Sequence, residues 1–269
     1  MEELRDARTV AGFVFVTDRS PDYLKAAAAG MRVTVPLSEP SRIVVDHAPE
    51  RVVVARWPGR LFRAQVATPA TDEEHAAMAS DNPRPDIGYT RAVAVDLQEE
   101  ISPSALFGPH GDAVVRVIEA AVALDERGAR NLASATHPAA GREYSNAWHQ
   151  WLSEPGHLAR DHASTLMAPR RGRPGSPIGY GFAVAWDMVR KSAELRGGEE
   201  AFAVDKNNDE ILSDPWRTAG GALLHAAMAF GAPHLADSHA IAMLTTAWNT
   251  VFEPAASGPS GDTGPQNCP

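Results

Sequence analysis

The hydrophobic pattern of this chain changes its period near residues 107–111, and this change constrains the fold more than any other feature. Before it, short apolar runs alternate with polar residues and are separated by Pro and Gly, as in β-strands. After it, apolar residues recur at the spacing of one helix face, at Val114, Val117, Ile118, Ala121 and Leu124. The pattern therefore predicts an α+β fold, in which a small mixed or antiparallel β module precedes an all-helical module.

The same patterns set the expected elements and units. Strands are predicted at 12–17, 32–37, 42–47, 51–57, 60–66 and 89–97, with one short helix at 22–29. Further helices are predicted from residue 112 and at 138–153, 157–167, 179–196, 214–230 and 234–252. We expect an α+β module at 1–107, a helical module at 108–253, and a disordered tail at 254–269 that is rich in Gly, Pro and Ser.

Composition excludes several classes of protein. The 269 residues are 44% hydrophobic, as in globular proteins, and carry a net charge of −9. Residues 1–109 hold 12 basic and 16 acidic groups (−4) and residues 110–269 hold 13 and 18 (−5), so neither half is basic enough overall for nucleic-acid binding. The single Cys268 cannot form an internal disulfide. The segment 157–161 has Leu158 and Asp161 where a helical zinc-hydrolase motif needs Glu and His. We expect a cytoplasmic protein with no metal, no nucleic-acid partner and no membrane segment.

One polar stripe interrupts an otherwise apolar helix. The segment 218–230 is apolar almost all round, which indicates a buried helix, and His225 lies within it. Arg217 lies two turns earlier along the same face, and Gly221 lies one turn earlier. The interpretation we favour is a core imidazole that is hydrogen-bonded inside the protein. The alternative is that Arg217 and His225 bind a ligand.

Three segments of the N-terminal half resemble a known family. The runs 13–18 (Phe-Val-Phe-Val-Thr-Asp), 59–66 and 89–97 are similar to the strand order of small ADP-ribosyltransferase-like domains, such as rifamycin ADP-ribosyltransferases. The resemblance covers about 85 residues. It implies that NAD is the cofactor, that Phe13 and Phe15 lie near a nicotinamide pocket, and that Asp72 or Glu73 lies near the reacting ribose. The family's His-Gly-Thr-like strand has no counterpart before Gly12.

Two functional hypotheses follow. The leading one is a binding or accessory protein without a cofactor, whose small-molecule or protein partner meets a surface between the two modules. It depends on the Arg217 and His225 stripe, on the absence of a complete catalytic set in the sequence, and on tryptophans expected to anchor a helical core, namely Trp148, Trp186, Trp216 and Trp248. The alternative is an enzyme that uses NAD or another nucleotide. Its candidate site residues are Arg60, Arg63, Asp72, Glu73 and Arg91.

Overall fold

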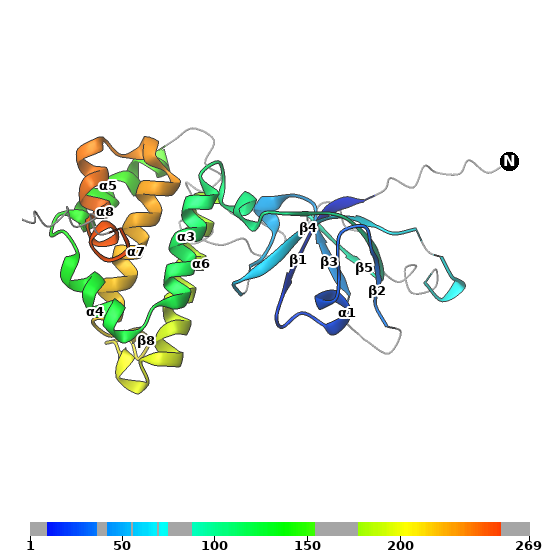
Figure 1. The fold of residues 1–269 in the computed structure, drawn as a ribbon, viewed down its shortest axis with the longest axis horizontal. Helices are drawn as coiled ribbons and strands as arrows, with labels where there is room; N and C mark the ends of the chain where they lie inside the picture. Colours follow the sequence, from blue (N-terminus) through cyan, green and yellow to red (C-terminus); the bar gives the residue numbers. More distant parts are fainter. Residues whose placement is uncertain are drawn as a thin grey trace, which may run out of the picture.

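A computed structural model describes residues 10–36, 42–54, 56–68, 70–74, 88–153 and 177–253. It confirms the α+β class, with an antiparallel sheet followed by helices (Figure 1). The predicted tail 254–269 and the predicted helix 157–167 lie outside the described residues.

The N-terminal part, here called the sheet region, is built on one sheet of six strands in the order β2-β6-β4-β1-β3-β5. All its pairings are antiparallel. The strands are β1 (Ala11–Thr17), β2 (Arg32–Thr34), β3 (Ile43–Asp46), β4 (Gly59–Val66), β5 (Tyr89–Ala92) and β6 (Ala94–Ile101). The short helix α1 (Asp22–Lys25) follows β1 and ends earlier than the predicted 22–29. A single turn, η1 (Pro49–Arg51), precedes β4.

The sheet closes on itself. Strand β5 lies at one end of the strand order and β6 lies next to the other end, yet only Val93 separates them in the chain. The two ends of the sheet must therefore meet at Val93, and the Val35 amide completes the join by donating to the Val93 carbonyl, N to O 2.8 Å. A closed sheet leaves few unpaired strand edges for other chains to add to.

Alternation along the strands fills the inside of this barrel. Val14 and Val16 of β1 point inward, whereas Phe13 and Phe15 point outward. Each strand contributes inward apolar side chains, and α1 adds Leu24. The inner core includes Val33, Ile43, Val45, Phe62, Ala64, Ala92, Val95 and Leu97. Each of these strands has one buried face and one outer face, and this alternation produces the period-2 pattern in the sequence.

The C-terminal part, here called the helical region, packs α-helices around one core. They are α3 (Gly111–Ala123), α4 (Glu126–Ala135), α5 (Ala140–Ser153), α6 (Pro177–Arg196), α7 (Trp216–Gly231) and α8 (Ser238–Phe252). A hairpin of β7 (Phe202–Val204) and β8 (Glu210–Leu212) follows α6. The four predicted tryptophan anchors all lie in or against this core. None of the helices in the described ranges is both long and apolar enough to cross a lipid bilayer.

Two predictions about elements were wrong. Residues 52–54 form no strand, because their alternating burial (Val52 and Val54 buried, Val53 exposed) comes from contact with the helical region and not from a strand partner. Helix α4 was missed, although Asp125 caps it by accepting a hydrogen bond from the Gly128 amide at 2.7 Å. Arg190 of α6 forms an ion pair with Glu210 of the hairpin, 3.1 Å between the nitrogen and the oxygen.

The two regions meet at a row of aromatic rings that we call the aromatic joint: Phe15, Trp57, Phe107 and Tyr180. Successive ring centroids lie 6.5, 5.8 and 5.7 Å apart. Phe107 ends the linking turn η3 (Pro103–Phe107), and Tyr180 belongs to α6. The Tyr180 hydroxyl accepts a hydrogen bond from the Val54 amide. One apolar core thus continues from the helices into the sheet, and the module boundary at 107/108 stays a prediction.

Candidate ligand-binding site

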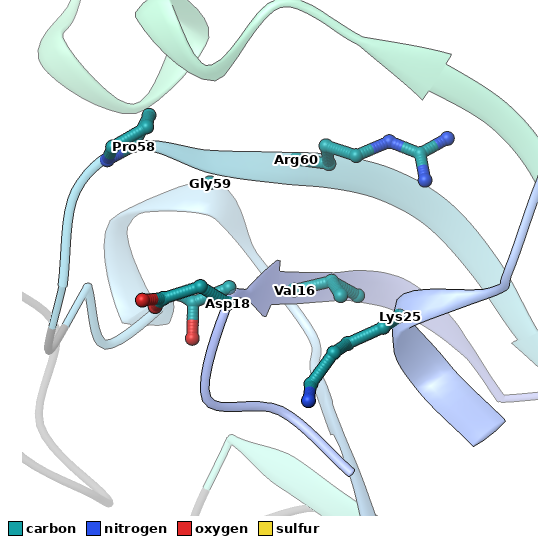
Figure 2. A pocket seen from close by; sticks show the side chains of 7 residues that line it. Val16, Asp18, Lys25, Pro58, Gly59 and Arg60 are labelled. Atoms are coloured by element: carbon teal, nitrogen blue, oxygen red, sulfur yellow. The ribbon is translucent and has the colours of Figure 1, made fainter. Parts of the chain in front are cut away.

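A cavity of about 350 Å³ opens at the barrel end where β1 finishes and β4 begins, beside α1 (Figure 2). Its volume lies at the lower end of the range of small-molecule pockets, about 300–1,000 Å³. It is lined by Val16, Thr17, Asp18, Lys25, Pro58, Gly59 and Arg60. All of these residues belong to the sheet region.

A glycine shapes one wall of the cavity. Gly59 pairs with Thr17 across the strands, and its α-carbon lies against the Phe15 ring. A β-carbon on Gly59 would come within 2.2 Å of Phe15 Cζ, so only glycine fits here without moving the ring. Because Phe15 belongs to the aromatic joint, this wall packs directly against the contact between the two regions.

Arg60 holds the cavity in its shape. Its Nε donates to Glu100 Oε1 at 2.9 Å, and its Nη1 donates to the Ala27 carbonyl, just after α1, at 2.8 Å. The guanidinium also lies 4.8 Å from the centre of the Phe62 ring, a cation–π distance. The hydrogen bonds from Arg60 lower the pKa of the Glu100 carboxyl. Figure 2 shows the guanidinium pointing away from Asp18. The aliphatic part of Arg60 therefore lines the cavity, while its guanidinium binds Glu100 and the Ala27 carbonyl.

The mouth of the cavity carries two further charges. The Lys25 ammonium lies 2.8 Å from Asp22, whose side chain is 98% exposed, and this ammonium lowers the pKa of the Asp22 carboxyl. Asp18 makes no side-chain hydrogen bond or ion pair with the described part of the chain. It sits in a turn fixed by its neighbours, in which the Thr17 amide donates to Ser20 Oγ at 2.9 Å. The site therefore offers one cation and one anion to a ligand.

Phe13 and Phe15 lie on the outer face of the sheet, away from this cavity's floor. Arg63 lies across from Phe13, with its guanidinium 5.7 Å from the ring centre, and it pairs with Glu99 at 3.3 Å. Phe15 is covered by Trp57. The two phenylalanines and Arg63 therefore lie together, but Arg63 and Phe15 are already engaged with protein groups.

Asp72 and Glu73 are exposed and follow β4 in the described segment 70–74. Their neighbour Glu74 is buried, binds Arg32 of β2 at 2.9 Å and accepts a hydrogen bond from the Ala70 amide at 2.6 Å. In the strand order, β6 and β4 lie between β2 and β1. Arg91 is exposed on β5. The structure does not bring the acids, Arg91 and the phenylalanines together into one site.

Arg217 and His225 lie in different surroundings. Arg217 is exposed and pairs with Asp214 at 2.7 Å. His225 is half-buried in what we call the imidazole cluster, with Tyr144, Trp148 and Phe182; its ring centroid lies 5.3 Å from that of Tyr144. Burial lowers the pKa of His225 to about 4, so the imidazole is neutral near pH 7. No group in the described ranges donates to it or accepts from it, contrary to the hydrogen-bonded core His that we favoured.

Of the cavity residues, only Arg60 was a candidate from the sequence. Asp18 and Gly59 lie in the runs that carry the resemblance, but nothing in the sequence marked them or Lys25 as a site. Asp18 and Gly59 come together because β1 pairs with β4, and Lys25 is brought there by α1. Among the described residues, no group of three His, Cys, Asp or Glu side chains could hold a metal ion.

Comparison with known proteins assigns no family. The fold and the cavity define an α+β protein with a small pocket at the end of a closed antiparallel sheet. No protein-family model, curated protein or solved structure matches the chain.

Proposed function

We propose that this protein binds a small molecule in the cavity between β1, β4 and α1. The observation that carries the proposal is that the walls of the cavity are fixed by bonds made outside it. Arg60 ties β4 to Glu100 and to the Ala27 carbonyl, and Gly59 is wedged against Phe15. A pocket that keeps its shape while empty loses little entropy when a ligand enters, which favours binding.

A blocking variant tests this function. Thr17 lines the cavity, whereas Arg19 is an exposed residue of the same turn that does not. We expect Thr17→Phe to fill the cavity and Arg19→Phe to leave it open. The measurement is the change in amide NMR signals of Thr17, Asp18 and Gly59 when 2-phenylethanol, 3-phenylpropionate, phenethylamine or phenylalanine is added.

The proposal expects saturable changes at these amides with at least one of the four probes. They should persist in Arg19→Phe and disappear in Thr17→Phe. If none of the probes moves these amides at about 10 mM, where even a Kd of about 1 mM gives nearly full occupancy, the cavity is not a binding site for small molecules.

The NAD-using enzyme implied by the ADP-ribosyltransferase resemblance stays a prediction, and the same experiment includes it. NAD is added as a fifth probe, with release of nicotinamide as the second readout. Turnover that is lost in Asp72→Ala would favour the enzyme over a binding protein. Asp112→Ala, which changes an exposed acid of the helical region, serves as the control.

A further inference from the structure

We infer that the ligand of this cavity is a small zwitterion, with its ammonium group beside Asp18 and its anionic group beside Lys25. This inference rests on the proposed binding function and specifies its ligand class. Figure 2 shows Asp18 at the end of β1 and Lys25 on α1, with the Lys25 side chain extending below Val16 toward the side of the view where Asp18 lies. A ligand that spans the cavity can therefore meet both charges at once.

The available cation is Lys25 and not Arg60. The Arg60 guanidinium is held by Glu100, by the Ala27 carbonyl and by the Phe62 ring. A ligand anion would have to break that arrangement to gain Arg60. Lys25 is held less strongly, because its ion-pair partner Asp22 is almost fully exposed. Such surface ion pairs contribute about 0–1 kcal/mol. An incoming carboxylate can share or replace Asp22 at little expense.

The available anion is Asp18. Its carboxylate makes no ion pair within the described part of the chain, and its backbone is held by the turn from Thr17 to Ser20. The Thr17 hydroxyl lies beside it on the cavity wall, where its oxygen accepts the Arg19 amide at 3.3 Å. A ligand ammonium could therefore find a carboxylate that the fold has positioned but not neutralised.

The lining of the cavity also has an apolar part. Val16 and Pro58 contribute to it. A ligand with a hydrocarbon part between or beside its charges would bury apolar area there, at about 25 cal/mol per Å². A phosphate-rich ligand fits less well, because it would have a single available cation and would be repelled by Asp18.

Four probes that share one phenyl group separate these possibilities. Phenylalanine carries both charges, phenethylamine lacks the carboxylate, 3-phenylpropionate lacks the ammonium, and 2-phenylethanol lacks both. We expect phenylalanine to bind most tightly in an NMR titration followed at the Gly59 amide. Removing either charge should weaken binding about two- to fivefold, the range of single exposed ion pairs. The preference should shrink in high salt.

Charge-removing variants assign each contact. Lys25→Gln should lower the affinity for phenylalanine to that for phenethylamine, and Asp18→Asn should lower it to that for 3-phenylpropionate. Lys206→Gln and Asp209→Asn are matched controls, because both residues are exposed in the β7–β8 hairpin and lie outside the cavity lining. Neither control should change the ranking of the probes.

The outcomes distinguish the ligand class from the function itself. Equal affinities for all four probes would overturn the zwitterion while leaving a binding cavity. Tightest binding of 3-phenylpropionate or of phenethylamine would also overturn it, in favour of an anion or a cation. Failure of every probe to move the cavity amides would overturn the proposed function as well.

Discussion

The sheet region and the helical region treat their polar side chains in opposite ways. In the sheet region, charged groups lie at the rim of the barrel, where they bind other segments: Arg60 fixes the chain after α1, and Glu74 fixes Arg32. In the helical region, a titratable imidazole, His225, lies among aromatic rings without a hydrogen bond from the described residues. The barrel places charged groups around a solvent-facing cavity, whereas the helical region holds a half-buried imidazole that is neutral near pH 7.

This difference follows from the two kinds of core. A small barrel fills its inside with alternate side chains of short strands, so polar groups are left for its ends and outer face. Helix α7 is buried around much of its surface, so a polar residue on it has little access to water. The aromatic joint lies between them and belongs to both. The predictions below test how separate the two regions are.

The largest effect is expected at the aromatic joint. Phe107 is fully buried between Trp57 and Tyr180, and truncation of such a ring costs about 3–5 kcal/mol. We expect Phe107→Ala to lower the unfolding free energy of both regions together, measured in urea by far-UV circular dichroism for the helices and by amide NMR signals for the sheet. Phe252→Ala, at a ring that is 39% exposed, should cost less. A loss confined to one region would show that the two fold independently.

The imidazole cluster should make the helical region sensitive to acid. The pKa of His225 is about 4 in the folded protein and about 6.5 when unfolded, so above pH 6.5 both states are neutral. As the pH falls from 6.5 to 4, the unfolded state binds a proton that the folded state does not, and stability falls by about 2–3 kcal/mol.

The His225→Phe variant should flatten this pH dependence in urea titrations followed by circular dichroism. His47 shifts in the same direction, because burial and Arg51 lower its pKa, so part of the slope will remain. His149→Phe is the control, since that ring is exposed on α5. An unchanged slope in His225→Phe would mean that the imidazole is not the group that titrates.

Much of the fold could be predicted from the sequence, because local periods report burial. The strand patterns that became β1, β4 and β6 have one buried face, and α5, α6, α7 and α8 have apolar stripes or apolar surroundings. Closure of the barrel could not be predicted, because it depends on β3 pairing with residues 89–92 and β4 pairing with residues 95–101 of one segment. The cavity depends on the same long-range pairing. Val52 and Val54 misled the prediction, because their partners are helices.

Two neighbouring acids of the sheet region, Glu73 and Glu74, should contribute differently to stability. Glu74 accepts hydrogen bonds from Arg32 and the Ala70 amide, and the Ala70 bond is the main cause of its lowered pKa. We expect Glu74→Gln to cost about 1–2 kcal/mol in thermal or urea unfolding at pH 7, because it weakens hydrogen bonds to a charged group. Glu73→Gln should stay within about 0.5 kcal/mol, since Glu73 is exposed. Equal costs at both positions would contradict the structural role of Glu74.

The smallest change in unfolding free energy is expected at Trp57 in the aromatic joint. The Trp57 indole Nε1 is buried and has no hydrogen-bond partner in the described part of the chain, and an unmade hydrogen bond of this kind costs about 1–3 kcal/mol. Trp57→Phe removes this donor and keeps an aromatic ring between Phe15 and Phe107, but it also loses buried apolar area. The two contributions nearly cancel, so we expect a change of less than about 1 kcal/mol, measured by urea unfolding.

Trp57→Leu is the matched control, because it removes the donor and the ring together. It should be clearly less stable than Trp57→Phe, since the ring contacts at 6.5 and 5.8 Å are lost. A loss above about 2 kcal/mol in Trp57→Phe itself would mean that the indole nitrogen has a partner. The polar atom at the aromatic joint would then be hydrogen-bonded. His225 would remain as the polar group without a hydrogen bond from the described residues, and the contrast between the two regions would rest on it.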